Sequence, residues 1–389
     1  MKSNVLTWVS QKVAIVLLLA GVSCDDEVRP LNDDDGNANE DTTTFTWAAT
    51  ADSLQATTYD TYLYTEGTFR QDNQGNTTFH YWWNAHMLDA LMDGYNRTGD
   101  DSYLPKMKAL LTGIETMHGG QYQNVFNDDM QWLGIACTRA YQATDDPQYL
   151  TVAWLLWDEI KKSWSDVFGG GITWRSDRPY GKNATSNGPA AILAMRLYEI
   201  EGNPDDLEWA EKIVAWEKAT LVDPATGLVW DNISQEGGES IINKDWIFTY
   251  NQGTYIGAAL ELYEETQNAM YLNDAVKTAR SVTSSPEVTS EGLLRDEGQG
   301  DGGLFKGILV RYFTRLILEP DLSENDRRNF VRFMQFNAET FYERGIHRPA
   351  MLGSSNWREQ PGATTDLSTQ LSGVMLMEAA VRLAEADLL

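Results

Sequence analysis

The chain has 389 residues, of which 42% are hydrophobic and 11% aromatic. This is enough apolar surface to bury one large core or two modest ones. Its formal net charge of -27 argues against DNA and RNA as partners, because affinity for phosphate polymers comes mainly from Lys and Arg side chains that neutralise phosphates.

Residues 1–23 follow the pattern of an export signal. Lys2 and Lys12 flank the start, residues 13–20 are apolar, and three small or short residues precede Cys24. The apolar run is too short to span a bilayer as a helix. The setting of Cys24 resembles a bacterial lipobox, in which the cysteine is acylated after cleavage. An uncleaved N-terminal helix and a soluble leader cut at Ser23 remain the alternatives.

Residues 24–45 form an acidic segment that we expect to be a flexible tether. Eight acidic residues and one arginine lie between positions 25 and 41, a composition that disfavours a packed core. Asp25-Asp26-Glu27 resembles the acidic signal that directs Bacteroidetes lipoproteins to the cell surface. We therefore expect an exported protein that touches the outer membrane only through lipid on Cys24, at the cell surface rather than in the periplasm. Cys137 has no credible disulfide partner and is expected in the core.

From residue 52 onward, apolar residues recur at helical spacing and alternating runs are scarce, which predicts an all-α domain over residues 46–389. Four units repeat a pattern: a helix ends near a tyrosine, a polar turn follows, and a second helix begins. These tyrosines are Tyr95, Tyr141, Tyr198 and Tyr263. The register predicts helices at 51–66, 82–98, 101–117, 128–143, 146–164, 187–201, 205–219, 251–266, 270–284, 302–318, 323–343 and 367–386.

Twelve helices make six hairpins. An open solenoid needs polar capping repeats at its ends, whereas apolar residues here continue into the last predicted helix. We therefore predict a closed (α/α)6 barrel. The connections after the four tyrosines are short, while the opposite ones are long, rich in aromatic residues and expected to carry function. These long connections lie near 118–127, 165–186, 220–250, 285–301 and 344–366.

Asp128 and Asp129 begin a predicted inner helix on the long-loop side. An Asp pair at a helix start usually only caps the helix, as expected for Asp100-Asp101, Asp145-Asp146 and Asp205-Asp206 in the short turns. Two adjoining carboxyls cannot both ionise easily, so one holds its proton more tightly. A retaining glycosidase needs this division between a nucleophile and an acid.

Several motifs of the chain together resemble glycoside hydrolase family 76, the endo-α-1,6-mannanases. They are Asn127-Asp128-Asp129 and the segments 169–174, 186–188, 227–231 and 249–253. The resemblance extends from about residue 46 to the C-terminus. It implies a retaining mechanism on an (α/α)6 barrel, with Asp128 as nucleophile and Asp129 as acid/base.

A cleft for sugars needs aromatic platforms and polar side chains that form paired hydrogen bonds. The side chains expected to bind substrate are Asn127, Trp132, Trp174, Asn187, Trp230, Asp231, Tyr250, Asn251 and Gln252. Some of these aromatic residues could instead only pack loops onto the barrel. The four histidines lack metal-ligand spacing, and neither a metal nor a cofactor is expected.

The sequence thus predicts a monomeric surface lipoprotein that cuts internal α-1,6 bonds in the neutral backbone of α-mannan. One alternative is an exo-acting or transglycosylating enzyme on the same barrel. A second is a surface lipoprotein that binds glycans without cleaving them, which would not need the carboxyl pair.

Overall fold

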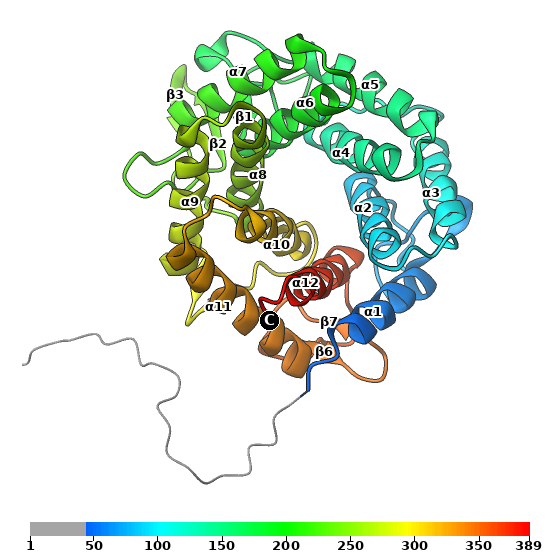
Figure 1. Ribbon diagram of the computed structural model, residues 1–389. Helices are drawn as coiled ribbons and strands as arrows, with labels where there is room; N and C mark the ends of the chain where they lie inside the picture. The colour runs from blue at the N-terminus through cyan, green and yellow to red at the C-terminus, as the bar shows by residue number, and fades with distance from the viewer. Residues whose placement is uncertain (1–43) are drawn as a thin grey trace, which may run out of the picture. The chain divides into compact units, whose positions relative to one another are not determined.

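Helices of an inner ring alternate along the chain with helices of an outer ring (Figure 1). The computed structural model describes residues 44–389; the expected signal segment, Cys24 and almost all of the expected tether lie outside them. The inner helices are α2 (Tyr81–Thr98), α4 (Asn127–Thr144), α6 (Gly188–Glu201), α8 (Thr249–Thr266), α10 (Gly302–Leu318) and α12 (Leu367–Glu385). The outer helices are α1 (Trp47–Tyr62), α3 (Tyr103–Met117), α5 (Pro147–Lys161), α7 (Pro204–Leu221), α9 (Ala269–Ser284) and α11 (Glu324–Thr340).

The inner ring is closed. Each inner helix packs against the next, and α12 packs against α2. This confirms the predicted (α/α)6 barrel and excludes the open solenoid. Eleven helices begin and end within three residues of their predicted bounds, while α1 is shifted by four because the chain leaves the helix at Leu63 and forms a separate turn at Thr65–Gly67.

The repeated tyrosines mark one kind of helix end. The residue that follows each of these four helices adopts a left-handed conformation and donates its N–H to the tyrosine carbonyl oxygen over 2.7 to 2.8 Å. Glycine fills this position at Gly99 and Gly202, and Asp145 and Gln267 fill the other two. Because such a residue stops the helix at once, the next helix begins after a short turn.

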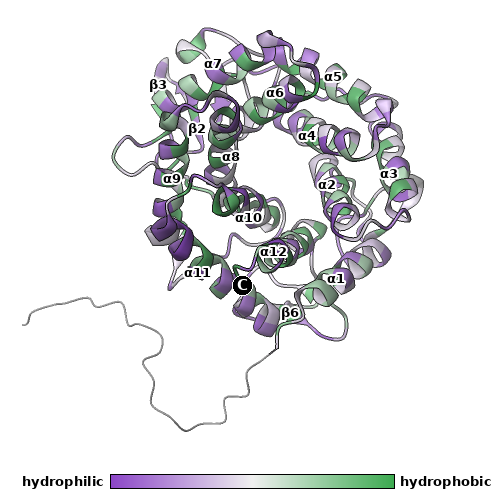
Figure 2. Cartoon of the chain, viewed as in Figure 1, coloured by the Kyte–Doolittle hydropathy of each residue, from purple (hydrophilic) through white to green (hydrophobic). Residues whose placement is uncertain are grey.

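Apolar contact between the two rings forms the core. Figure 2 shows hydrophobic residues along α10 and α12, while much of the outer helix α11 is hydrophilic. Neighbouring inner helices approach closely where side chains are small: a Cβ atom on Gly253 of α8 would lie 2.6 Å from the Cα of Leu309 in α10. Cys137 is buried in the core, as expected. None of the helices formed by residues 44–389 is long and apolar enough to cross a bilayer.

The long connections contain short β-strands, and the sequence did not predict these strands. β1 (Gly181–Asn183), β2 (Asn232–Glu236) and β3 (Glu239–Ile242) form an antiparallel sheet in the order β1-β2-β3. Gly237 and Gly238, both with positive φ, make the two-residue turn between β2 and β3. Two smaller hairpins pair β4 (Thr289–Ser290) with β5 (Leu293–Leu294), and β6 (Ile346–His347) with β7 (Leu352–Gly353).

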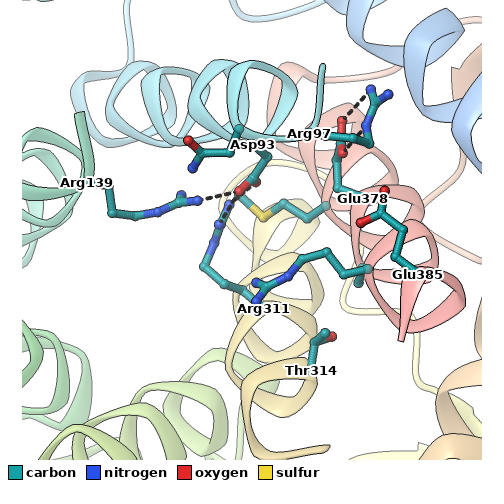
Figure 3. Close-up of a pocket in the computed structure, with 11 residues that line it drawn as sticks. Asp93, Arg97, Arg139, Arg311, Thr314, Glu378 and Glu385 are labelled. Atoms are coloured by element: carbon teal, nitrogen blue, oxygen red, sulfur yellow. Dashed lines mark hydrogen bonds and ion pairs between the residues drawn. The ribbon is translucent and has the colours of Figure 1, made fainter. Parts of the chain in front are cut away.

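A cluster of ion pairs joins the inner helices at the short-turn end (Figure 3). Asp93 of α2 accepts hydrogen bonds of 2.6 Å from Arg139 of α4 and from Arg311 of α10. Nearby, Arg97 pairs with Glu378 of α12 at 2.7 Å. Burial opposes ionisation of Asp93, but the two guanidinium groups outweigh it and hold the pKa of this carboxyl well below its usual value. The cluster lines a cavity of about 310 Å³.

Candidate active site

Asp128 and Asp129 occupy the first turn of α4 and are held by different donors. Asp128 Oδ2 accepts a 3.2 Å hydrogen bond from Trp174 Nε1, and its Oδ1 accepts the backbone N–H of Asp129 at 3.1 Å. Asp129 Oδ2 accepts a 2.7 Å bond from Asn124 Nδ2. Neither residue is the N-cap of α4, and both carboxyls line a cavity.

That cavity has a volume of about 410 Å³ and lies at the long-loop end of the barrel. It brings together five residues predicted for the site, namely Asp128, Asp129, Trp132, Trp174 and Tyr250. The sequence missed seven further residues that line it: His80, Trp82, Phe126, Asn183, Thr185, Asp301 and Phe305. Aromatic walls around two carboxyl groups suit a sugar ring, which presents apolar faces and hydroxyl edges.

The two carboxyls differ in how tightly they hold a proton. Burial raises the pKa of Asp128 to about 7, against the opposing effect of its hydrogen bonds from Asp129 N–H and Trp174. Burial and the nearby charge of Asp128 raise the pKa of Asp129 well above its usual value. Asp128 therefore ionises first and Asp129 keeps its proton, which gives the pair one carboxylate and one carboxylic acid.

A third carboxyl, Asp301, faces the same cavity. It lies immediately before α10, and its Oδ1 accepts hydrogen bonds of 3.1 Å from the indole N–H groups of both Trp82 and Trp83. Its charge adds to the rise in the pKa of Asp128 and Asp129, behind the larger effect of burial. A sequence signal for it exists, because it is an acid at the start of an inner helix on the long-loop side, like Asp128.

A second, larger cavity of about 1130 Å³ adjoins the first along the β1-β2-β3 sheet. The two share Trp174, Asn183 and Tyr250 in their linings. Asp231 lines the larger cavity; its oxygens accept 2.8 Å and 3.0 Å bonds from Asn232 and Asn251, and burial raises its pKa.

Four amide residues expected to bind substrate lie behind the cavity walls. Asn127, Asn187, Asn251 and Gln252 are completely buried. Gln252 pairs with both the N–H and the C=O of Val229 at 2.8 Å, and Asn187 pairs in the same way with Ile172.

Asn127 donates to the Thr173 carbonyl oxygen at 2.8 Å, and Asn251 holds Asp231. These geometries favour a supporting role for the four amides over the direct substrate contact that the sequence suggested. Their value to the site is that they fix the loops carrying Trp174 and Asp231 to the barrel.

Trp230 lines neither cavity, and the Lys244 ammonium covers its ring at 4.4 Å. The alternative that some aromatic residues only pack loops onto the barrel therefore fits Trp230. Trp357, in the connection between α11 and α12, is also a packing residue: it is 1% exposed and lies under the buried Lys306. Within residues 44–389, no cluster of three or more His, Cys, Asp or Glu residues is arranged to hold a metal ion.

Comparison with known proteins gives consistent matches. A solved α-1,6-mannanase of Salegentibacter sp. HEL1_6 is 62% identical, with a TM-score of 0.86; the match covers 87% of this chain and 99% of that one. An inactive variant of that mannanase, with two consecutive aspartates changed to asparagine, has been solved with α-1,6-mannotriose. The Lin0763 protein of Listeria innocua is 35% identical, with a TM-score of 0.80, over 88% of this chain and 99% of that one.

Among curated relatives, a mannan endo-1,6-alpha-mannosidase of Eremothecium gossypii is 26% identical over 284 residues, which is 67% of this chain and 59% of the relative. The chain thus spans less than two thirds of that relative's length. The model of glycosyl hydrolase family 76 matches residues 46–387, and the chain belongs to this family.

Proposed function

We propose that the protein is a retaining, endo-acting α-1,6-mannanase that hydrolyses the backbone of α-mannan. The observation that carries the proposal is the pair of adjoining carboxyls in one aromatic cavity, with Asp129 holding its proton more tightly than Asp128. The solved relative with this fold at 62% identity is an α-1,6-mannanase, and replacing two consecutive aspartates accompanies loss of its activity.

In this proposal, ionised Asp128 attacks the anomeric carbon while Asp129 transfers its proton to the departing glycosidic oxygen. The bond from the anomeric carbon to that oxygen breaks as the ester to Asp128 forms. Asp129, now ionised, takes a proton from water, and the resulting hydroxide displaces Asp128. Each cycle consumes one water and returns both carboxyls to their starting protonation states.

The test is cleavage of debranched α-1,6-mannan by the wild type and by Asp128→Asn and Asp129→Asn. Each variant should lose at least about 10³-fold in kcat, since each removes an essential group of the reaction. Asp145→Asn is the matched control, because Asp145 lies in a short turn at the other end of α4 and asparagine tolerates its left-handed conformation. Full activity in either catalytic variant would refute the assignment.

The products distinguish the alternatives. A spread of oligomers early in the reaction supports endo cleavage, whereas release of single small units would indicate an exo-acting enzyme. Sugar transfer to added mannose would indicate transglycosylation. Binding without any release of reducing ends would indicate a glycan-binding protein.

We also propose that the protein is exported and carries lipid on Cys24, on the strength of the segment before that residue and the acids after it. Labelling with a fatty-acid analogue should modify the wild type and not Cys24→Ser. We propose that the domain is a monomer, which the mass of the purified protein in solution would check.

A further inference from the structure

The cavity at the short-turn end gathers arginines from four of the inner helices (Figure 3). They are Arg97 of α2, Arg139 of α4, Arg311 of α10 and Arg382 of α12. The chain as a whole carries a formal net charge of -27, so a wall with four guanidinium groups is unusual for it. The end of the barrel opposite the Asp pair is thus the place where positive charge collects.

Arg382 is the arginine of this wall that lacks a partner. The carboxylates Asp93 and Glu378 are already engaged by the other three arginines of the cavity. Arg382 lines the cavity and is exposed there, but it forms no ion pair and no side-chain hydrogen bond with any other residue of 44–389. Its guanidinium group therefore offers unused donors to whatever enters the cavity.

The surroundings of Arg382 disfavour its charge. Desolvation by the cavity walls, together with the charges of Arg139, Arg311 and Arg315, lowers the pKa of this guanidinium against the opposing effect of Asp93. Arginine keeps its proton in proteins all the same. A bound anion, rather than loss of the proton, is therefore the way to balance this charge.

Glu385 is the internal competitor for Arg382. It lies three residues later on α12 and lines the same cavity, yet the two side chains form no ion pair. An exposed pair at this spacing on a helix would contribute little. Glu385 should therefore weaken the binding of an anion without preventing it.

The shape of the donor set favours a tetrahedral oxyanion over a planar carboxylate. A guanidinium group binds two oxygens of one anion at once. The cavity also holds the amide of Asn96, and its donors come from several helices around it rather than from one plane. An ion with oxygens in four directions can reach more of these donors, and ordered water can fill the rest of the roughly 310 Å³.

We propose that this cavity binds a tetrahedral oxyanion, of the class of phosphate and sulfate, with Arg382 as the residue that decides binding. The anion would link α12 to α2 and α10, its neighbours in the inner ring. Since α12 and α2 are the two inner helices whose contact closes the barrel, binding stabilises the closed ring. The chemistry at the other end of the barrel is not affected.

The test is thermal unfolding of the whole protein at increasing concentrations of inorganic phosphate, with ionic strength held constant by sodium chloride. The Tm of the wild type should rise along a saturating curve, by about 4 °C at a hundred-fold excess over Kd. Arg382→Gln should lose this saturating rise. Excluded salts also stabilise proteins in general, but that effect does not saturate and is the same in every variant.

Two further variants make the result specific. Arg332→Gln is the matched control, because Arg332 is an exposed arginine of the outer helix α11 that does not line the cavity; it should respond to phosphate as the wild type does. Glu385→Gln removes the competing charge and should lower the Kd for phosphate by about two- to five-fold.

The proposal is overturned if phosphate gives no saturating rise in the wild type, or if Arg382→Gln shows the same rise. It is also overturned if Glu385→Gln binds phosphate more weakly, or if acetate at the same ionic strength acts as strongly as phosphate. The measurement needs no mannan and no catalytic turnover. Failure of the proposed function would therefore leave it unaffected.

Discussion

The indole N–H of Trp174 donates to Asp128 Oδ2 over 3.2 Å and links the loop at residues 165–186 to the start of α4. This bond favours the ionised form of Asp128 against the effect of burial, which raises the pKa to about 7. Trp174→Phe keeps an aromatic ring and removes the donor, so the pKa of Asp128 should rise further. The acidic limb of the kcat/KM profile should move to higher pH, and an unmoved limb would contradict this role.

Asn124 should affect the alkaline limb of the pH profile of kcat/KM. Its amide favours the ionised form of Asp129, whose pKa burial and Asp128 raise well above the usual value. Asn124→Ala should therefore raise that pKa and move the alkaline limb to higher pH, with little change in the acidic limb. The same pH titration of kcat/KM compares the two variants, and a shift of both limbs together would show that the donors do not act separately.

The raised pKa of Asp129 should cost stability at neutral pH. Below about pH 4 both the folded and the unfolded chain hold the proton, and Asp129→Asn should melt with the wild type. Above that pH the unfolded chain ionises while the folded chain keeps the proton, so stability of the wild type falls until the folded pKa is passed. The variant should then have a Tm several degrees higher than the wild type at pH 7. Calorimetry of both proteins, below about pH 4 and at pH 7, measures the difference in Tm. An equal difference at the two pH values would exclude the raised pKa of Asp129 as its cause.

The ion pairs at the short-turn end should act on stability and not on catalysis. Asp93→Ala leaves Arg139 and Arg311 without one of their partners, and breaking such a buried cluster typically costs about 3–5 kcal/mol in the free energy of unfolding. Asp52→Ala removes the 57% exposed partner of Arg97 and should cost about 1 kcal/mol or less. Urea titration measures both. A fall in kcat of the folded Asp93 variant would contradict the separation of the two ends.

The barrel could be predicted because its signals are local and repeated. Tyr95, Tyr141, Tyr198 and Tyr263 recur in the same place before each helix end, and the left-handed residue that follows terminates the helix. The sheet escaped prediction because β1 has three residues and its partner β2 lies about 50 residues later, so neither carries an alternating pattern long enough to read.

Part of the site could be predicted because the position of a residue relative to a helix start is also a local signal. Asp128, Asp129 and Tyr250 lie at helix starts on the long-loop side, where position alone suggests a role. Asn187 and Gln252 carry the same signal, yet they hold loop backbone, because a buried amide can satisfy an N–H and a C=O together. Sequence does not distinguish an amide that faces a sugar from one that faces a peptide.

The place where the chain enters the barrel has a consequence for access to polymers. Phe45 and Trp47 line a shallow hollow together with Ala384 and Glu385, which lie at the C-terminal end of α12. This end of the barrel is opposite the catalytic mouth. A membrane attachment upstream of Phe45 would therefore join the domain at the end opposite the catalytic mouth. Mannan strands too large to reach the lipid surface could then still be cut, and a carrier fused at the N-terminus should not obstruct them.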